Sequence, residues 1–388
     1  MSQPIPKKIL QKKPELAEKP FNTLLIDGSN LLELSSLGDV QLSSGGKPIG
    51  GIYQFFLQTM LLMKKGNFRY VYVFWDGTNS GYLKYKLLPE YKSNRDKDFR
   101  EEEGLSDYMK EVNRKVKQMQ NYFYKKQDPV KLAEKKKHKE VFHWQRDVII
   151  QCLEELFVRQ CLCDKIEADD FIGYYVTHKK PNERIVIASN DRDMTQLISD
   201  DVIVYVQSMK DFLTVKNYRK EEGIDHRNVV LKKVICGDTS DNIKGIKGVG
   251  EKTLLTNFPE IKERKVELNE IIEKAKLINE ERVKNKKQPL KWAENIVNRI
   301  SDGSQGDKIY EINTKVIDLK NPLMTEEAIE MIEGMMYVPM DPEGRTLDNL
   351  YKILLENEVE PLLQESTFGG FFSDFLYLIE KEKRNLPV

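Results

Sequence analysis

Short runs of apolar, β-branched and aromatic residues recur in the first half of the chain, and each ends in an acidic residue beside a turn signal. The run in FNTLLID ends at Asp27, the run in RYVYVFWD ends at Asp76, and the run in RIVIASND ends at Asp191 and Asp193. Runs of this length and composition predict buried strands. Residues 49–65, between the first two runs, have the length and apolar spacing of a helix. This alternation predicts an α/β fold with a mostly parallel central sheet flanked by helices.

The acids at the strand ends predict a shared site. In open parallel sheets, sites form at the edge where the carboxyl ends of the strands lie. A single aspartate in this position is most often a helix cap. Three strand ends that all carry acids are better explained by one cluster of carboxylates than by three separate caps.

A second group of acids follows an amphipathic stretch. Residues 147–163 have the apolar spacing of a helix, and the sequence KIEADD then places Glu167, Asp169 and Asp170 at the start of the next helix. Acids at a helix N-terminus favour the helix dipole, so this placement is partly structural. Three acids in four positions nevertheless exceed what a cap requires.

Chain length suggests how the remaining segments are organised. At 388 residues the chain can form two structural units. We expect a loose arm over residues 1–20, an α/β core over residues 21–235 and a helical region over residues 236–388. The helical region is expected to contain charged helices over residues 259–300, an extended segment over residues 308–320 and short helices over residues 325–384.

A basic insertion, residues 79–146, interrupts the predicted core between its second and third strands. It holds 18 Lys/Arg and 11 Asp/Glu, a net charge of +7 in a chain that is neutral as a whole. Its later part, KLAEKKKHKE, predicts a charged helix, and a solvated helical excursion is one interpretation of the whole segment. Its first part mixes aromatic and basic residues in a pattern suited to phosphate contact and base stacking. These residues are Tyr82, Lys84, Tyr85, Lys86, Tyr91, Lys92 and Arg95.

The stretch GDTSDNIKGIKGVGEKT, residues 237–253, joins acids to a glycine-rich run. Asp238 and Asp241 are spaced so that both carboxylates can point at one metal ion. Gly245, Gly248 and Gly250 would let the backbone approach a phosphate chain closely, because glycine has no Cβ. The stretch therefore predicts a junction between a metal site and a nucleic-acid contact.

The collected acids favour divalent metal chemistry. Gathered at one sheet edge they would repel one another, and they could not all stay ionised without a compensating cation. A set of oxygen ligands without Cys or His favours Mg²⁺ or Mn²⁺ over zinc. Two such ions about 3.5–4 Å apart can activate a water and stabilise the leaving oxygen of a phosphodiester. The nine acids are Asp27, Asp76, Glu167, Asp169, Asp170, Asp191, Asp193, Asp238 and Asp241.

Other chemistries find less support in the sequence. The four cysteines have no CxxC spacing, so we expect buried free thiols. The four histidines lie outside the acidic motifs, and the chain has no triad, GxGxxG or Walker pattern. No apolar run reaches membrane-spanning length, and the N-terminus lacks the apolar core of a secretion signal. We therefore expect a soluble cytoplasmic protein that does not contact a membrane.

Seven motifs in order, IDGSN, VFWDG, LPEYKSNR, IEADD, SNDRD, GDTSDN and GIKGVG, resemble those of the 5′ nuclease superfamily of flap endonucleases and 5′→3′ exonucleases. They cover residues 21–258, and their order and number make the match specific. The sequence SGYLKYKLLPEYKSNR and the histidine-free acid set most resemble the T-even phage ribonuclease H branch. The resemblance implies a PIN-like α/β core, a helical arch in the basic insertion and a helix-three-turn-helix element after the core.

The resemblance also implies roles for individual residues. Lys92 and Arg95 match arch residues that meet the scissile phosphate, and Tyr91 would stack on the frayed terminal base. Asp170 matches an acid that contacts the metal ligands rather than the metal ion. The ligands of a first ion would be Asp27, Asp76, Glu167 and Asp169, and those around a second would be Asp191, Asp193, Asp238 and Asp241.

The stretch from Gly245 to Gly250, with Gly248 between them, resembles the hairpin with which relatives grip duplex DNA and bind a monovalent cation such as K⁺ through backbone carbonyls. The expected phosphate contacts recognise shape and charge rather than sequence, so affinity should fall steeply with salt. They are Lys244, Lys247 and Lys252 around the hairpin and Lys84 and Lys86 in the arch.

The implied function is a metal-dependent, structure-specific 5′ nuclease that removes RNA primers or 5′ flaps during replication in a phage-infected bacterial cell. Its substrates would be DNA and RNA–DNA with 5′ flaps or ends, and it would act as a monomer. A PIN-like ribonuclease and a non-catalytic DNA-junction binder are the alternatives. The C-terminal sequence QESTFGGFFSDF superficially resembles a sliding-clamp peptide, although its aromatic residues fall one place late. A core helix and a contact with a replication protein, such as a clamp or a single-strand-binding protein, both remain open for this segment.

Overall fold

A six-stranded sheet forms the centre of the molecule in the computed structural model, which describes residues 21–384 apart from residues 37–42, 67, 94–128, 339 and 342. The strand order is β3-β2-β1-β4-β5-β6, and only the β5–β6 pair is antiparallel. The predicted mostly parallel α/β fold is therefore confirmed. The strands are β1 (Thr23–Asp27), β2 (Tyr70–Trp75), β3 (Arg159–Leu162), β4 (Ile185–Ala188), β5 (Val202–Val206) and β6 (Asp211–Leu213).

The central strands are buried on both faces because helices cover both. Every residue of β1, β4 and β5 is buried, and this accounts for their continuous apolar runs. Leu24 and Ile26 face one hydrophobic cluster, whereas Leu25 faces the other. The first cluster is built with α1 (Gly28–Ser36), α2 (Gly50–Met63) and α5 (Pro129–Glu155), and the second with α6 (Ala168–Thr177), α8 (Val229–Cys236), α12 (Ile309–Ile317) and α13 (Glu326–Tyr337).

Shorter elements connect the core to the site. Helix α3 (Tyr82–Leu87) follows β2, and η2 (Arg192–Leu197) follows β4. Helix α7 (Tyr218–Glu222) and η3 (His226–Asn228) lead from β6 to α8. Both α3 and η2 therefore begin near the carboxyl ends of parallel strands, at the predicted site edge.

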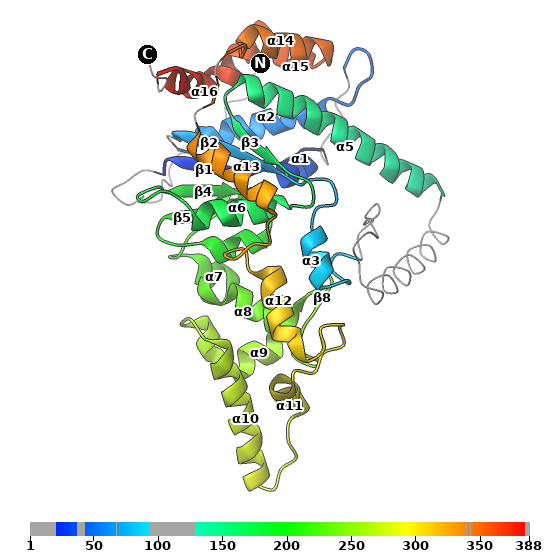
Figure 1. The fold of residues 1–388 in the computed structure, drawn as a ribbon, viewed down its shortest axis with the longest axis vertical. Helices are drawn as coiled ribbons and strands as arrows, with labels where there is room; N and C mark the ends of the chain where they lie inside the picture. Colours follow the sequence, from blue (N-terminus) through cyan, green and yellow to red (C-terminus); the bar gives the residue numbers. More distant parts are fainter. Residues whose placement is uncertain are drawn as a thin grey trace, which may run out of the picture.

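A helical region continues from α8 and projects from one end of the molecule (Figure 1). It begins with a two-stranded antiparallel hairpin, β7 (Gly237–Asp238) and β8 (Ile243–Lys244). The glycine-rich run follows, and its last glycine is the N-cap of α9. The remaining elements are α9 (Glu251–Asn257), η4 (Pro259–Lys262), α10 (Leu268–Lys284), α11 (Lys291–Asn298) and η5 (Gly306–Lys308).

The last helices return to the core rather than extending this helical region. Helix α13 contacts β3 and α6, while α14 (Leu347–Glu356) contacts α5 and α16 (Glu365–Arg384) contacts α2. Figure 1 shows α14, α15 (Glu360–Leu363) and α16, in orange and red, at the opposite end from α10 and α11. The hairpin thus begins one residue after the boundary expected at residue 236, and the last helices pack on the core.

Two predicted elements are wrong in the described structure. The helix expected over residues 147–163 ends at Glu155, and the chain then enters strand β3 after Phe157, which has a positive φ of 57°. Strand β3 forms because β2 offers a parallel edge to pair with. The extended segment expected over residues 308–320 is instead helix α12, whose residues Ile309, Asn313 and Val316 are buried at helical spacing.

Two further expectations are confirmed among the described residues. All four cysteines are free thiols, and three of them are buried. Helix α16 buries Phe372, Phe375 and Leu378 against the core, so the core-helix alternative for the C-terminal segment is confirmed. None of the described helices combines the length and the apolar character that crossing a membrane requires. The predicted arm, residues 1–20, lies outside the described residues.

Candidate active site

Two of the strand-end acids link their strands to other segments at the sheet edge. Asp27, at the end of β1, accepts hydrogen bonds from the backbone of Asn30 at 3.0 Å and from the hydroxyl of Ser189 at 3.0 Å. The carboxylate of Asp76, directly after β2, accepts from the backbone N–H of Ala168 at 2.9 Å. Each acid therefore joins two chain segments as well as presenting charge at the sheet edge.

One of the acids after β4 also holds a backbone group while it presents charge at the sheet edge. Asp191 is the N-cap of η2, and its carboxylate accepts from the backbone N–H of Asp193 at 2.8 Å. The capping role considered for such acids is thus present together with the clustering, since one carboxylate oxygen can cap while the other remains available.

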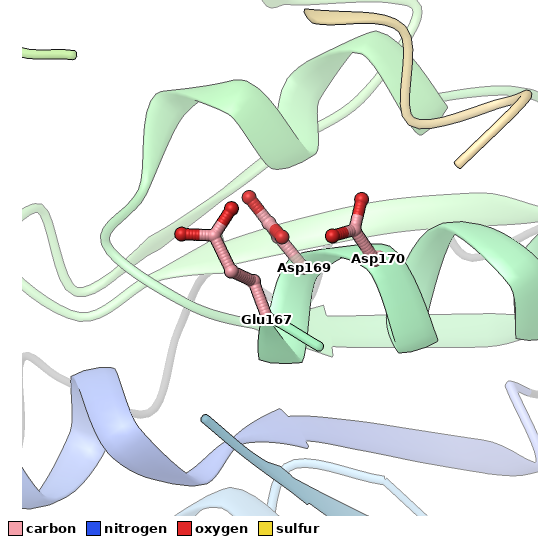
Figure 2. A group of neighbouring side chains, drawn as sticks. All are labelled: Glu167, Asp169 and Asp170. Atoms are coloured by element: carbon pink, nitrogen blue, oxygen red, sulfur yellow. The ribbon is translucent and has the colours of Figure 1, made fainter. Parts of the chain in front are cut away.

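Glu167, Asp169 and Asp170 project from the start of α6 (Figure 2). Glu167 is the N-cap residue, and the two aspartates lie in the first turn. Each offers a carboxylate oxygen within 4.8 Å of the others. Figure 2 shows the three carboxyl groups side by side on one side of the helix, an arrangement that could hold a metal ion.

An open pocket of about 260 Å³ brings five predicted acids together. They come from four segments that are distant in the sequence, and the side chains of Lys92, Ser29 and Asn30 also line the pocket. The acids are Asp27, Asp76, Glu167, Asp169 and Asp191. Five of the acids predicted to cluster at the carboxyl edge of the sheet therefore line one pocket.

Lys84 lies inside the acidic cluster, not on a DNA-facing surface. Its side chain is 3% exposed, and its ammonium is 2.9 Å from Glu167, 3.0 Å from Asp170 and 3.3 Å from Asp169. Burial alone would lower the pKa of Lys84, but the three carboxylates outweigh it and hold the pKa well above its usual range. The predicted DNA contact is therefore corrected, because this lysine is fully engaged as a counterion for α6.

Tyr91 is also enclosed, so the expected stacking on a terminal base is not supported. Its ring is 1% exposed, and its hydroxyl donates to Glu167 at 2.8 Å. Lys92 contacts the other oxygen of Glu167 at 2.5 Å and lies 3.9 Å from Asp241. Of the predicted arch residues, Lys92 thus reaches the pocket, Lys86 is exposed beside the ring of Tyr82, and Arg95 lies outside the described residues.

A second group forms around Lys233, a residue that the sequence reasoning missed. Its ammonium pairs with Asp193 and with Asp238, the latter at 2.6 Å. The Asp241 carboxylate lies 3.9 Å from the Lys92 ammonium, and the Asp241 backbone carbonyl accepts from the Lys92 N–H at 2.8 Å. The Asp241 N–H donates to Asp238 at 3.4 Å. The structure thus keeps Asp193 and Asp238 together and links Asp241 to the first pocket through Lys92.

The pKa values show that carboxylate charge is in excess in the first pocket. Burial and then the charge of Asp76 raise the pKa of Asp27 well above its usual range. Burial, followed by the charge of Glu167, likewise raises the pKa of Asp76. The neighbouring lysines therefore do not fully neutralise these acids.

The Lys233 group has a different balance. Burial and the nearby Asp191 raise the pKa of Asp193 to about 6, although Lys233 opposes them. For Asp238, burial raises the pKa, but Lys233 and Ser240 outweigh it and lower the value to about 2. Asp193 therefore remains the less well compensated member of this pair.

The glycine-rich run forms a loop between β8 and α9 that is tied to the end of α11. The Gly245 carbonyl accepts from the Ser301 hydroxyl at 2.9 Å, and the Lys247 carbonyl accepts from the Asn295 amide at 2.8 Å. A Cβ on Gly245 would collide with the backbone of Cys236 and Gly237. This glycine is thus required by packing inside the hairpin, not by the close phosphate approach suggested for it.

The outer side of the same loop is open. A Cβ would meet nothing within 4 Å at Gly248 or Gly250, and Gly248 has a positive φ of 76° that favours glycine. Lys244, Lys247 and Lys252 are all exposed, and Lys247 forms an ion pair with Asp302 at 2.7 Å. The loop therefore presents backbone and basic side chains on one accessible surface.

Several site residues escaped sequence reasoning because their types are common. The Ser29 hydroxyl accepts from the backbone of Asp76 at 2.9 Å, and the Asn30 side chain accepts from the backbone of Asn190 at 3.0 Å. Their position directly after a strand-ending acid, in IDGSN, was the available signal. The sequence around Lys233 has no comparable signal, because the pattern of α8 is that of an ordinary amphipathic helix.

The pocket fits a divalent cation. Its donors are carboxylate oxygens, which suit hard cations, and Asp27 and Asp76 retain raised pKa values beside the lysines. An excess of buried carboxylate is the condition that a bound cation relieves.

Comparison with known proteins assigns the family. Residues 22–228, more than half of the chain, match the model of the 5′-3′ exonuclease, N-terminal resolvase-like domain. A 5′-3′ exonuclease of Buchnera aphidicola subsp. Schizaphis graminum is 28% identical over 257 residues, which cover 64% of this chain and 74% of that protein. A 5′-3′ exonuclease of Mycoplasmopsis pulmonis is 38% identical over 96 residues, covering 24% of this chain but only 32% of that protein.

Solved structures agree on the fold. A T5 5′-exonuclease structure, described as having divalent metal ions (zinc) bound, aligns with a TM-score of 0.55 and 18% identity over 87% of this chain and 98% of the other. The family match confirms the resemblance to 5′→3′ exonucleases, while the T-even branch stays a prediction. The chain belongs to the 5′-3′ exonuclease family that this N-terminal resolvase-like domain defines.

Proposed function

We propose that the protein is a metal-dependent, structure-specific 5′ nuclease that hydrolyses phosphodiesters where single-stranded and duplex nucleic acid meet. The observation that carries the proposal is the pocket in which acids from β1, β2, α6 and the β4 end converge with Lys92. Family membership supports the reaction class, because the matched domain contains these four segments.

The proposed ligands of the first ion are Asp27, Asp76, Glu167 and Asp169, with Asp170 supporting them through Lys84. Those around the second ion are Asp191, Asp193, Asp238 and Asp241. Mg²⁺ is the proposed ion, with Mn²⁺ as a substitute, because the donors are oxygens and include no thiol or imidazole. Bound cations supply activation of a water and stabilisation of the leaving oxygen.

The lysines have separate proposed tasks. Lys84 is engaged with the α6 acids and orients them. Lys92 is the residue we propose to meet the scissile phosphate, because its ammonium already lies at the pocket wall. Arg95 is proposed for the same task from the sequence motif alone.

Duplex binding is proposed for the loop from Lys244 to Lys252. Its exposed lysines and open glycines suit a phosphate backbone, and the PIN-like ribonuclease alternative would not require such a loop. A K⁺ ion is proposed here as well. The carbonyls of Gly245 and Lys247 already accept one hydrogen bond each, so K⁺ would use their second lone pairs or other carbonyls of the loop.

We propose DNA and RNA–DNA with 5′ flaps or ends as substrates, a monomeric protein, and a site of action in the cytoplasm of a phage-infected bacterial cell. These proposals rest on the motif resemblance. A contact with a clamp through α16 loses support, because Phe372 is buried in the core. Any replication partner would instead meet the exposed side of this helix.

The test is cleavage of a labelled 5′-flap duplex and of its matched single strand, each with Mg²⁺ and with a chelator. Metal-dependent cutting at the flap base is expected. In Asp76→Asn and Asp191→Asn proteins, which keep the hydrogen-bond acceptors, we expect a rate loss of about 100-fold or more, because the metal ligands lose their charge. Cutting by both variants at the wild-type rate would refute the proposal, and cutting of the single strand alone would indicate another nuclease class.

A further inference from the structure

The turn after α3 that carries Lys92 is held by two other chain segments. The Lys92 N–H donates to the Asp241 carbonyl at 2.8 Å. The side-chain amide of Asn242 donates to the Glu90 carbonyl at 3.0 Å and to the Ser93 hydroxyl at 2.8 Å. The β7–β8 turn thus holds the Lys92 turn through the Asp241 carbonyl and the Asn242 side chain, without using the carboxylates in the pocket.

The carboxylate of Glu90 makes a second attachment. One oxygen accepts from the Ser304 N–H at 3.1 Å, and the other accepts from the Ser304 hydroxyl. Ser304 belongs to the loop that follows α11. The Lys92 turn is therefore held from one side by the hairpin and from the other by this loop.

The same loop holds the proposed duplex-binding run. Ser301 donates to the Gly245 carbonyl at 2.9 Å, the Lys247 N–H donates to the Ile300 carbonyl at 2.9 Å, and Gln305 donates to the Lys244 carbonyl at 3.2 Å. A continuous path of hydrogen bonds therefore runs from the glycine-rich loop through residues 300–305 and Glu90 to Lys92. Lys92 in turn contacts Glu167 in the pocket.

Each of the two turns contains a residue with a left-handed backbone. Lys92 has a φ of 50°, which lysine rarely adopts, and Asn242 has a φ of 55°, which asparagine adopts more readily. Such conformations persist only where surrounding contacts determine them, and they concentrate at functional sites. Here the contacts that determine them are the hydrogen bonds between the two turns.

We propose that Glu90 and Asn242 are positioning residues that couple occupancy of the glycine-rich loop to the placement of Lys92, so that a seated duplex raises the rate of cleavage. We call this set, Glu90, Lys92, Asp241, Asn242 and Ser304, the arch-base link. A duplex on the loop restrains residues 300–305, the link restrains the left-handed Lys92 turn, and the ammonium stays at the pocket. Specificity for junctions then arises in turnover as well as in binding. The inference rests on the proposed nuclease function and adds to it the way in which the duplex is sensed.

The first experiment compares wild type with Asn242→Gly, which removes the amide but keeps the left-handed backbone accessible. Asn182→Gly is the matched control, since Asn182 has a φ of 64° in an exposed turn on the amino side of β4, away from the site. We expect Asn242→Gly to slow single-turnover cleavage of the flap duplex about tenfold or more, because a small displacement of a positioned group has an effect of this size. The dissociation constant for the flap duplex in chelator should change less than about twofold, and so should the slow rate on the matched single strand.

A double variant tests whether the two attachments act as one path. If they do, Asn242→Gly combined with Glu90→Ala should be no slower than the slower single variant, since residues in one network are not additive. An equal loss on flap duplex and single strand would overturn the proposal, because the link would then only support Lys92 locally. Unchanged rates on both substrates would overturn it as well.

A readout without catalysis separates this inference from the proposed function. In chelator, adding flap duplex to wild type should increase protection of residues 85–93 against hydrogen exchange, and Asn242→Gly should lose that increase while still binding. A wild-type protein that fails to cut in Mg²⁺ but shows this protection would refute the nuclease and leave the coupling standing. Protection that is absent in wild type with bound duplex would refute the coupling whatever the cleavage result.

Discussion

At the scale of single residues, the pocket acids combine a structural task with the chemical task proposed for them. Asp27 accepts from Asn30 and Ser189, Asp76 from Ala168, and Asp191 from Asp193. Asp76 and Asp191 can fix the chain with one oxygen and offer charge with the other, whereas both oxygens of Asp27 accept hydrogen bonds. The proximity of several carboxylates makes this arrangement costly at neutral pH unless cations are present.

Asp193 gives the clearest pH prediction. Its pKa in the folded protein is about 6, above the ordinary value of 3.8, so the folded state takes up a proton before the unfolded state does. The charged form of Asp193 therefore lowers the free energy of unfolding above pH 6. The free energy of unfolding rises as the pH falls through 6 towards 3.8.

We expect the metal-free protein to gain about 1 kcal/mol of unfolding free energy from Asp193 between pH 7.5 and pH 5.5, measured by urea denaturation. Asp193→Asn should lose this part of the pH dependence, and the difference between the two proteins removes the opposing contribution of His226, whose pKa burial lowers. Asp238 does not interfere, because its pKa of about 2 lies outside this window. Parallel pH profiles for the two proteins would contradict the prediction.

At the scale of elements, α16 shows how the C-terminal segment joins the core. Phe372 packs against Phe56 with ring centroids 5.6 Å apart and against Phe375 at 6.2 Å. Helix α16 packs on α2 in this way, and it lies beyond the 22–228 range matched by the family model. The helix therefore adds a layer that the family domain alone does not include.

Removing one aromatic side chain of α16 measures how much this helix contributes to the free energy of unfolding. Phe375→Ala should lower the free energy of unfolding by about 3–5 kcal/mol, because the ring is fully buried. Leu376→Ala, at the next position and 41% exposed, should change it by less than about 0.5 kcal/mol. Urea denaturation of both variants checks this, and equal small effects would show that α16 contributes little to folding stability.

At the scale of the whole molecule, the sheet edge and the glycine-rich loop lie on separate parts that meet through the hairpin and α12. Helix α12 contacts both α8 and α3, so it joins the two regions. In the proposed function, a substrate that reaches both would present duplex to the loop and a strand end to the pocket. The proposed phosphate contacts and the proposed chemistry therefore lie on different elements.

The loop lysines should determine the salt dependence of duplex binding. Replacing Lys244, Lys247 and Lys252 by glutamine should reduce the slope of log affinity against log salt by up to about 3, since each phosphate contact contributes roughly 0.9. Replacing Lys210, Lys216 and Lys352, which are exposed elsewhere, alters net charge equally and should leave the slope nearly unchanged. Binding titrations in chelator at several salt concentrations provide the measurement. Equal slopes for both triple variants would show that the loop does not contact the phosphates.

The sequence by itself determined strands β1, β2 and β4 of the sheet and the identity of its acidic edge. Runs such as TLLID and YVYVFW are apolar almost throughout, as strands covered on both faces are, and a parallel sheet brings their carboxyl ends together. The start of α6 was equally predictable from the sequence, because acids before an apolar helical run mark a helix N-terminus. These features depend on residues close together in the chain, which is why pattern alone was sufficient.

Only the tertiary structure decided how the charges pair and how the later segments fold. Lys84 lies 85 residues from Asp169, and Lys233 lies 40 residues from Asp193, so no local pattern predicts that these lysines enter the acidic groups. Strand β3 forms because β2 has a free edge, and the C-terminal helices pack on α2 and α5 because those helices present apolar surface. Burial and ion pairing depend on which segments meet in space, and that is fixed only when the whole chain has folded.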